Sequence, residues 1–227
     1  MKNLATLTAG IALLATGHAW AAPCPTATYA TYLATAGFSC TQGDKTFSNF
    51  SYLVDGNGLG ITPSAVAINV IPGGFGFAFD AVWQAPNPIS AGTPNAIADS
   101  TISYTATVNT PGVLITDATV AIAASATLVG FGSATETING MALSASTSIP
   151  PGEGPNTITF PGVTSVNVTK DIEANSGAIA GGSAVVSSVT DSLSQSIVST
   201  PEPASLTLLG SALVGLGWLT RRRRKAA

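Results

Sequence analysis

The fold class of this chain is first indicated by an alternating stretch, Thr101-Ile102-Ser103-Tyr104-Thr105-Ala106-Thr107-Val108. Apolar side chains occupy every second position, and hydroxyl side chains occupy the positions between them. Successive side chains of a β-strand point to opposite faces, so a period of two predicts a half-buried strand with one apolar face and one hydroxyl face. The segment 165–172 repeats the pattern, with Val166, Val168 and Ile172 on one face.

Turn-forming clusters divide the rest of the chain into short segments rich in Thr, Ser, Val, Ala and Ile, which is strand composition. The spacing of these clusters suits a sandwich. They are Pro72-Gly73-Gly74, Pro86-Asn87-Pro88, Thr110-Pro111-Gly112 and Pro150-Pro151-Gly152. Val189, Leu193 and Ile197 are spaced by four, as in a helix, but their serine-rich surroundings favour a strand. We therefore predict a mainly β ectodomain over residues 22–199, an antiparallel, jelly-roll-like β-sandwich.

One predicted strand carries four aromatic side chains on a single face: Phe75, Phe77, Phe79 and Trp83. Aromatic rings of this kind fill the core of a sandwich, and they can also form a platform for sugar rings. The sequence favours the core and leaves the ligand face as an alternative. Ten of the 13 aromatic residues between residues 22 and 200 lie at or before Trp83, so the first half should hold the dense core.

Composition and charge exclude several classes of protein. With 227 residues, 45% hydrophobic and 8% charged, the chain is unlike a disordered one, which needs low hydrophobicity and many charges. Between residues 22 and 200 the basic side chains are Lys45 and Lys170 only, against ten acidic ones. Without arginine in that span, nucleic-acid binding is excluded.

The same composition argues against catalysis. The single histidine is His18, near the start, and a serine-hydrolase triad needs a histidine base. Lys170 lies next to Asp171 and close to Glu173, where a solvated ion pair is expected. The acids are scattered singly and are expected to be solubilising surface charge, although a pair across a cleft, as in glycosidases, stays open as an alternative. We predict that the chain is not an enzyme and binds no cofactor.

A short acidic turn, Asp55-Gly56-Asn57-Gly58, has two interpretations. Asp-Gly and Asn-Gly are turn-forming pairs, which suffices to explain it. Calcium binding is the alternative, because calcium prefers oxygen ligands on a flexible loop.

Two cysteines, Cys24 and Cys40, are the complete set in the chain. An exported chain meets an oxidising compartment, so a structural disulfide with one possible connectivity is predicted.

The first residues have the features of a secretory signal. Lys2 precedes an apolar run over 4–15, and Ala19-Trp20-Ala21 has the small-x-small pattern that signal peptidase recognises. We predict a signal helix over 1–21, with cleavage after Ala21 or Ala22.

The last residues have three parts. Pro201, Glu202 and Pro203 precede an apolar stretch over 204–219, for which a transmembrane helix is predicted. A basic cluster then follows, which should stay cytoplasmic and so places everything upstream on the far side of the inner membrane. The cluster comprises Arg221, Arg222, Arg223, Arg224 and Lys225.

This tail, over 200–227, resembles the PEP-CTERM sorting signal of Gram-negative bacteria, with Pro201, Glu202 and Pro203 matching its Pro-Glu-Pro motif. The resemblance implies that a membrane-embedded exosortase recognises the motif, removes the helix, and releases or re-attaches the protein outside the cell. It also implies a link to extracellular polysaccharide and biofilm matrix. Residues 37–52 resemble the opening of ectodomains found in PEP-CTERM proteins, which implies a β-rich secreted module of uncharacterised activity.

The function expected from these features is that of an exported, non-enzymatic envelope or matrix protein. It would be anchored in the inner membrane, cut near the Pro-Glu-Pro motif by an exosortase, and then associated with exopolysaccharide at the outer surface. The alternative is a carbohydrate-binding module that uses the strand from Phe75 to Trp83.

Overall fold

The computed structural model describes most of the chain between the two predicted targeting segments. The described residues are 21–55, 59–86, 96–147, 155–179, 181–198 and 210–214. The predicted signal helix over 1–21 lies outside them except for Ala21. The Pro-Glu-Pro motif at 201–203 and the basic cluster at 221–225 also lie outside the described residues.

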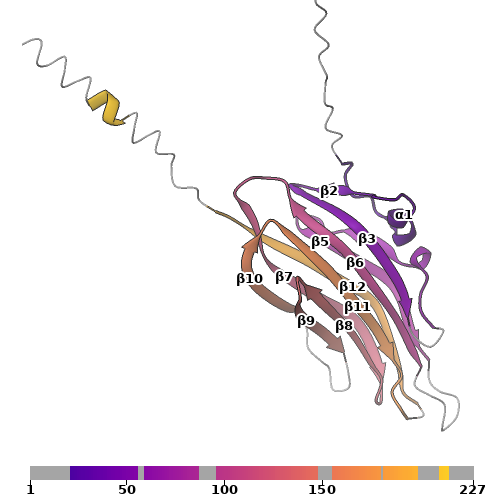
Figure 1. Ribbon diagram of the computed structural model, residues 1–227. Coiled ribbons are helices and arrows are strands. Elements are labelled where there is room, and N and C mark those ends of the chain that lie inside the picture. Colours follow the sequence, from indigo (N-terminus) through magenta and orange to yellow (C-terminus); the bar gives the residue numbers. More distant parts are fainter. Residues whose placement is uncertain are drawn as a thin grey trace, which may run out of the picture.

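The described body consists of two six-stranded antiparallel sheets that pack face to face (Figure 1). Sheet A has the order β2-β3-β6-β11-β8-β9, with the bounds Cys40–Gln42, Lys45–Asp55, Ile97–Val108, Ser165–Asn175, Phe131–Ile138 and Met141–Thr147. Sheet B has the order β1-β4-β5-β12-β7-β10, with the bounds Ala27–Thr28, Ala67–Val70, Phe75–Ala85, Ser183–Ile197, Val113–Thr127 and Asn156–Val163. A short helix, α1 (Tyr29–Leu33), and a 3-10 turn, η1 (Pro63–Ala65), accompany the first strands.

Strand pairing is nested along the chain. β5 pairs with β12, β6 with β11, β7 with β10 and β8 with β9. These eight strands form one long antiparallel hairpin, rolled so that successive pairs fall in alternate sheets, which is the jelly-roll arrangement. The prediction of a mainly β, antiparallel sandwich is confirmed. The first four strands extend one edge of each sheet.

The alternating stretches occupy the centre of sheet A, as β6 and β11. Their apolar side chains point into the space between the sheets, while their hydroxyl neighbours face outward. The two strands pair in direct register, for example Tyr104 with Val168. The buried apolar side chains of these stretches are Ile102, Tyr104, Ala106, Val166, Val168 and Ile172.

Strand β12 contains the residues with helix-like spacing, Val189, Leu193 and Ile197, but an interval of four also keeps side chains on one face of a strand. Val186 and Val189 both face the core although they are three residues apart, because the register against β7 shifts between Val186 and Ser188. Such a β-bulge adds one residue and reverses the phase of the alternation. Beyond Leu193 the strand leaves the core, and Ile197 is 80% exposed. The preference for a strand over a helix is confirmed.

Aromatic rings from both sheets form the densest part of the core. Phe77 of β5 meets Phe47 of β3 and Tyr104 of β6 edge-on, at ring-centroid distances of 4.8 and 5.5 Å. Tyr29 and Tyr32 of α1 are fully buried and close over this group. Edge-to-face packing adds to the free energy gained by burying each ring. The expected concentration of the core in the first half is confirmed for these rings.

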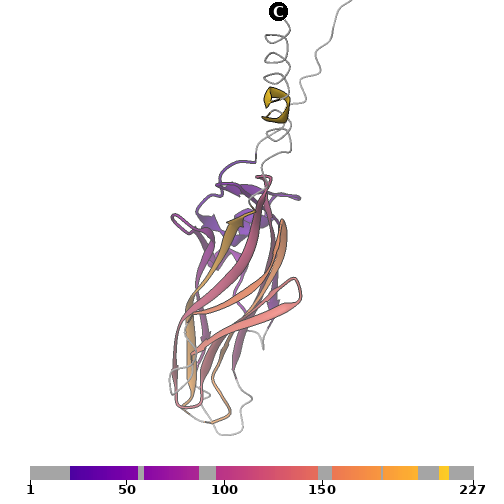
Figure 2. The ribbon, with the colours of Figure 1, turned by 90° about the vertical axis from the view of Figure 1, so that its left-hand side faces the viewer.

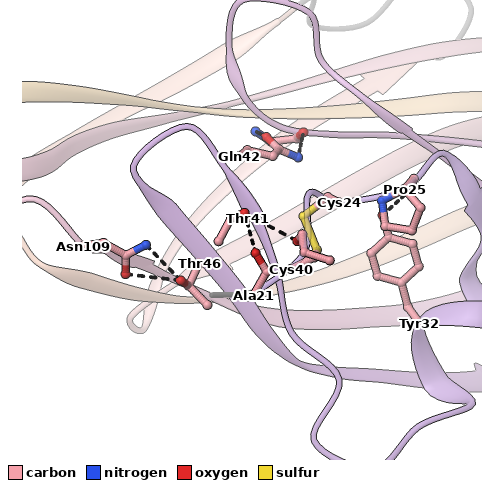
Figure 3. The surroundings of a disulfide bond; sticks show 11 residues. Ala21, Cys24, Pro25, Tyr32, Cys40, Thr41, Gln42, Thr46 and Asn109 are labelled. Carbon is pink, nitrogen blue, oxygen red and sulfur yellow. Dashed lines mark hydrogen bonds between the residues drawn. A yellow bond between two sulfur atoms is a disulfide. The ribbon is translucent and has the colours of Figure 1, made fainter. Parts of the chain in front are cut away.

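The segment before β1 is tied to the edge strand β2 by the predicted disulfide, Cys24–Cys40, which is confirmed (Figure 3). The Thr41 amide donates to the Ala22 carbonyl at 2.8 Å, and the Thr41 hydroxyl donates to the Ala21 carbonyl at 3.1 Å. The residues on either side of the predicted cleavage site therefore lie along β2.

The first and last segments of the sandwich lie together at one end of the body (Figures 1 and 2). Gln195, close to the end of β12, accepts a hydrogen bond from Lys45, the first residue of β3. The Val198 amide donates to the Gly112 carbonyl at 2.7 Å. Because β2 and β3 form a hairpin, the Cys24–Cys40 disulfide lies at this end too. We call it the disulfide end.

The predicted transmembrane helix over 204–219 lies mostly outside the described residues. Residues 210–214 are helical. Within the part of the chain that the structure describes, no helix has the length and apolar character needed to cross a membrane.

The disulfide is predicted to contribute substantially to stability. It joins residues 16 apart in sequence, and a closed loop of that size stabilises a protein by about 3 kcal/mol. We expect a Cys24→Ala, Cys40→Ala variant to unfold at lower urea concentration, with a loss of about 3 kcal/mol in the free energy of unfolding. Wild-type protein treated with reductant is the control and should show the same loss. An unchanged midpoint in both samples would refute the prediction.

Candidate functional site

An ionic cluster lies fully buried between the two sheets. It consists of Lys170 on β11, Glu136 on β8 and Asp191 on β12, each 0% exposed. The Lys170 Nζ atom contacts Oε2 of Glu136 and lies 3.2 Å from Oδ2 of Asp191. Lys170 and Glu136 belong to sheet A, whereas Asp191 belongs to sheet B. The lysine therefore bridges the two layers.

The pleat of the strands places these three side chains in the interior. Lys170 has the same parity as Val168 and Ile172, which are buried on the inner face of β11. Lys170 and Glu136 are direct cross-strand partners. Their side chains therefore start from neighbouring points on the same face of sheet A.

The prediction that Lys170 forms a solvated ion pair with Asp171 or Glu173 is wrong. Those two acids have odd numbers and point to the outer face, opposite to Lys170. The prediction that the acids are solubilising surface charge is also wrong for Glu136 and Asp191. The even spacing of Val166, Val168, Lys170 and Ile172 was the available signal for the lysine.

Burial dominates the electrostatics of the cluster. Loss of hydration lowers the pKa of Lys170 well below its ordinary value and raises the pKa of Asp191 well above its ordinary value. Asp191 is flanked on sheet B by Phe77 and Val120, its direct cross-strand partners. Among the described residues, no hydrogen-bond donor other than the lysine reaches either carboxylate.

These surroundings favour the uncharged forms of amine and acid. A buried ion pair repays the cost of desolvating its charges only when further hydrogen bonds complete it. Here two carboxyl groups share one amine inside an apolar layer. Moving one proton from Lys170 to Asp191 produces a neutral amine beside a neutral carboxylic acid, with Glu136 still able to accept a proton. The chemistry available to the cluster is therefore proton transfer and nucleophilic attack by nitrogen.

A second group of acids lies on the outer face of sheet A. Asp99 of β6 pairs in register with Asp55 of β3 and with Glu173 of β11, and Asp171 follows on the same face. Partial burial raises the pKa of Asp99 to about 7, and its hydrogen bond with Asp171 together with the neighbouring negative charges adds to the rise. In the folded chain Asp99 is thus protonated across the mildly acidic range.

The other lysine of the body, Lys45, is also buried but lies at the disulfide end. Its Nζ atom is 3.0 Å from Oδ1 of Asp44 and 3.3 Å from the ring centroid of Phe75, a cation–π contact. Burial lowers the pKa of Lys45, and the contact with Asp44 opposes this shift. The acid partner of Lys45 is partly open to solvent, whereas both acid partners of Lys170 are fully buried.

A pocket of about 480 Å³ opens beside these residues. Phe75, Gly43 and the turn over 71–74 line it, next to Cys24 and Thr41. The Gln42 side chain holds one wall in place (Figure 3). Its Nε2 donates to the Gly76 carbonyl, and its Oε1 accepts from the Gly76 amide. The lining has no carboxylate, so the pocket suits an apolar or uncharged group.

The alternative hypothesis, that the aromatic face of β5 binds a sugar, is wrong because most of its rings are buried. Phe77, Phe79 and Trp83 are 0% exposed, and Phe75 packs against the core and under Lys45. The four side chains do share one face, as the period of two predicted. For Phe77, Phe79 and Trp83 that face is the inner one, so these rings fill the core, while Phe75 lies at its edge and lines the pocket at the disulfide end.

The outer face of sheet A instead presents paired polar side chains, which we call the hydroxyl face. Ser103 donates to Thr169 at 3.2 Å, and Thr105 donates to Asn167 at 2.9 Å. The hydroxyl face consists of Ser103, Thr105 and Thr107 of β6 with Ser165, Asn167 and Thr169 of β11. It confirms the hydroxyl faces predicted for both strands.

The proposed calcium turn lies largely outside the described residues. Asp55 ends β3, and residues 56–58 follow it undescribed. In the described ranges, no group of three or more His, Cys, Asp or Glu side chains is arranged to hold a metal ion.

The decisive comparison concerns the tail. Residues 199–224 match the sequence model of the family described as the PEP-CTERM protein-sorting motif. The chain carries a PEP-CTERM sorting motif. The resemblance seen in Pro201, Glu202 and Pro203 is therefore confirmed. A PEP-CTERM motif indicates an exported protein that is anchored in the membrane and then processed by an exosortase.

Other comparisons add little to the PEP-CTERM assignment. The comparison with curated proteins found no match. Among solved structures, the enzymatically active domain of tailspike protein 4 from bacteriophage CBA120 aligns with a TM-score of 0.22 and 16% identity. The alignment covers 64% of this chain but only 19% of the tailspike chain. A TM-score of this size does not indicate a common fold.

The raised pKa of Asp99 predicts a specific pH dependence of stability. Between its ordinary pKa of 3.8 and its folded value of about 7, the folded chain holds a proton that the unfolded chain has released. Stability must then fall as the pH rises through that window. We expect Asp99→Asn to flatten this fall in urea unfolding measured from pH 4.5 to pH 8 (roughly the window between the two pKa values).

Asp117→Asn, the same substitution on sheet B, is the control and should keep the wild-type slope. Comparison of each variant with the wild type removes the contribution of the other titrating groups. Equal slopes in Asp99→Asn and in the wild type would contradict the assignment.

Proposed function

We propose that this protein is an exported, non-enzymatic component of the cell envelope or extracellular matrix of a Gram-negative bacterium. The observation that carries the proposal is that the sandwich ends directly before the sorting motif begins. The last strand, β12, ends at Ile197, and the PEP-CTERM match begins at residue 199. The body is therefore complete where the sorting segment starts, as expected of a module that is delivered and then released.

The position of both chain ends supports delivery in a defined orientation. Ala22 accepts a hydrogen bond from Thr41 of β2, and Val198 follows the end of β12 that contacts Lys45, so both lie at the disulfide end. While the tail is in the membrane, this end faces the bilayer, and the strand ends at Asp55 and Asn175 point away from it. Cutting near the Pro-Glu-Pro motif then frees the body without disturbing a strand.

A non-enzymatic role fits the chemistry of the exported span. Residues 22–200 contain no histidine and no arginine. The two lysines are buried, and one of them lies in the closed layer between the sheets. General acid–base work on an outside substrate needs groups within hydrogen-bond reach of that substrate.

The hydroxyl face supports association with exopolysaccharide. Its side chains are uncharged donors and acceptors, arranged in rows across two adjacent strands. Polysaccharide hydroxyls can exchange hydrogen bonds with such rows and need no aromatic platform. This mode replaces the earlier alternative based on the buried Phe75 to Trp83 strand.

Processing is tested by changing the central residue of the motif. We expect Glu202→Gln to leave the tail attached in a host that contains an exosortase, while wild-type protein is recovered without it. Intact-mass analysis distinguishes the two products. Glu153→Gln is the control and should be processed normally. Recovery of wild-type protein with Arg221 to Lys225 still attached would overturn the processing proposal.

Matrix association is tested on the hydroxyl face. Thr105→Val with Thr169→Val keeps side-chain shape but removes two hydroxyls, each worth about 1 kcal/mol when bonded. We expect the pair to weaken retention on isolated matrix polysaccharide by about thirtyfold. The control is Thr119→Val with Thr157→Val, an exposed hydroxyl pair on sheet B. Equal retention of both variants and the wild type would refute this face as the binding surface.

A further inference from the structure

We infer that Lys170 and Asp191 become joined by an amide bond between Nζ and Cγ, with Glu136 carrying the proton, so that the folded chain links its two sheets covalently. This is a modification that the chain performs on its own side chains. It is independent of the proposed matrix function.

The geometry places the reacting groups within reach. Lys170 Nζ lies 3.2 Å from Oδ2 of Asp191, so the amine is in contact with the carboxyl group whose Cγ it would attack. Facing sheets lie about 10 Å apart, and an extended lysine with an aspartate opposite it can span that gap. Lys170 lies on β11 and Asp191 on β12, and each of these strands has a hydrogen-bonded neighbour on both sides in its own sheet, so the fold holds both side chains in place. The Lys170 amine and the Asp191 carboxyl group are therefore already in contact in the native state.

The surroundings supply the reactive protonation states. Nitrogen attacks only as a neutral amine, and a carboxylic acid accepts attack far better than a carboxylate. Lys170 is flanked by Ile102 on β6, and Asp191 by Phe77 and Val120. One proton passed from the ammonium to Asp191 creates both reactive forms without exchange with solvent.

Glu136 is placed to carry the proton. It contacts Nζ from the neighbouring strand of the same sheet. As the nitrogen lone pair forms a bond to Cγ of Asp191, the Glu136 carboxylate takes a proton from nitrogen. It then returns that proton to the departing hydroxyl group, which leaves as water. Amine and acid thus become amide and water, Glu136 is regenerated, and no oxidant or reductant is needed.

Asp191 is the acid that we assign to the bond because it stands across the interlayer space. Glu136 and Lys170 already belong to hydrogen-bonded neighbouring strands. A bond to Asp191 removes an amine and an acid from the apolar interior and leaves one carboxyl group behind. Three buried ionisable groups are costly to desolvate, and the bond replaces them with an uncharged amide beside a single acid.

The mass of the denatured, reduced wild-type protein is the primary test. We expect it to be lower than the mass of its sequence by one water molecule. Trypsin gives a second readout, because residues 22–200 contain only Lys45 and Lys170 as cleavage sites. Trypsin should cut after Lys45 and leave Lys170 intact. Fragmentation of the peptide that starts at Thr46 should then place the link between Lys170 and Asp191, with residues 171–190 held in a closed loop.

Single substitutions test which residues form the amide bond and which one carries the proton. Lys45→Met changes the other buried lysine and should keep the mass deficit. Lys170→Met and Asp191→Ala should each show the full sequence mass. Glu136→Gln keeps the shape but cannot accept the proton, so formation should slow by roughly a hundredfold or more. Uncrosslinked protein should then be recovered.

The wild-type result stands even if a variant fails to fold. A wild-type mass without the deficit, together with tryptic cleavage after Lys170, would overturn the inference. A link from Lys170 to Glu136, found by the same fragmentation, would overturn the assignment of Asp191.

Discussion

Phe77 packs edge-on against Phe47 and Tyr104 across the space between the sheets, and this contact organises the disulfide end of the body. Tyr29 from α1 closes over the rings and reaches the carbonyl oxygens of Ser51 and Ser103 on sheet A, both at 3.0 Å. The helix is too short to be stable in isolation, so this packing holds it in place. The disulfide joins the same region, because it ties the segment ahead of α1 to β2.

Beyond this aromatic core the sandwich is filled differently. The inner faces of β7, β8 and β9 are rich in alanine, valine and isoleucine. Among these small side chains the long Lys170 side chain crosses from sheet A toward Asp191 on sheet B. An unpaired charge in such a layer would be strongly destabilising, so the lysine and its two acids belong together as one unit. The covalent bond that we infer would hold the layers together where large rings do not.

The arrangement suits a protein that works outside the cell. Ala22 and Val198, on either side of the sandwich in the sequence, both lie at the disulfide end, so cleavage beyond β12 leaves the sheets intact. The hydroxyl face lies on the outer surface of sheet A, where its side-chain hydrogen bonds are exposed. A disulfide at one end and an interlayer bond between central strands would resist unfolding in an environment that lacks chaperones and energy supply.

The sequence by itself determined the sorting motif, the disulfide, the period-two strands and the shared face of Phe75 to Trp83, because each can be read from residue types and their spacing along the chain. Only the tertiary structure decided which charges are buried. Lys170, Glu136 and Asp191 are separated by 34 and 21 positions in the chain, and their meeting depends on the order of β8, β11 and β12 in two sheets. The parity of Lys170 placed it on an inner face, but the acids that accompany it there come from the nesting of the strands. Pairing across sheets is set by topology, which local periodicity does not encode.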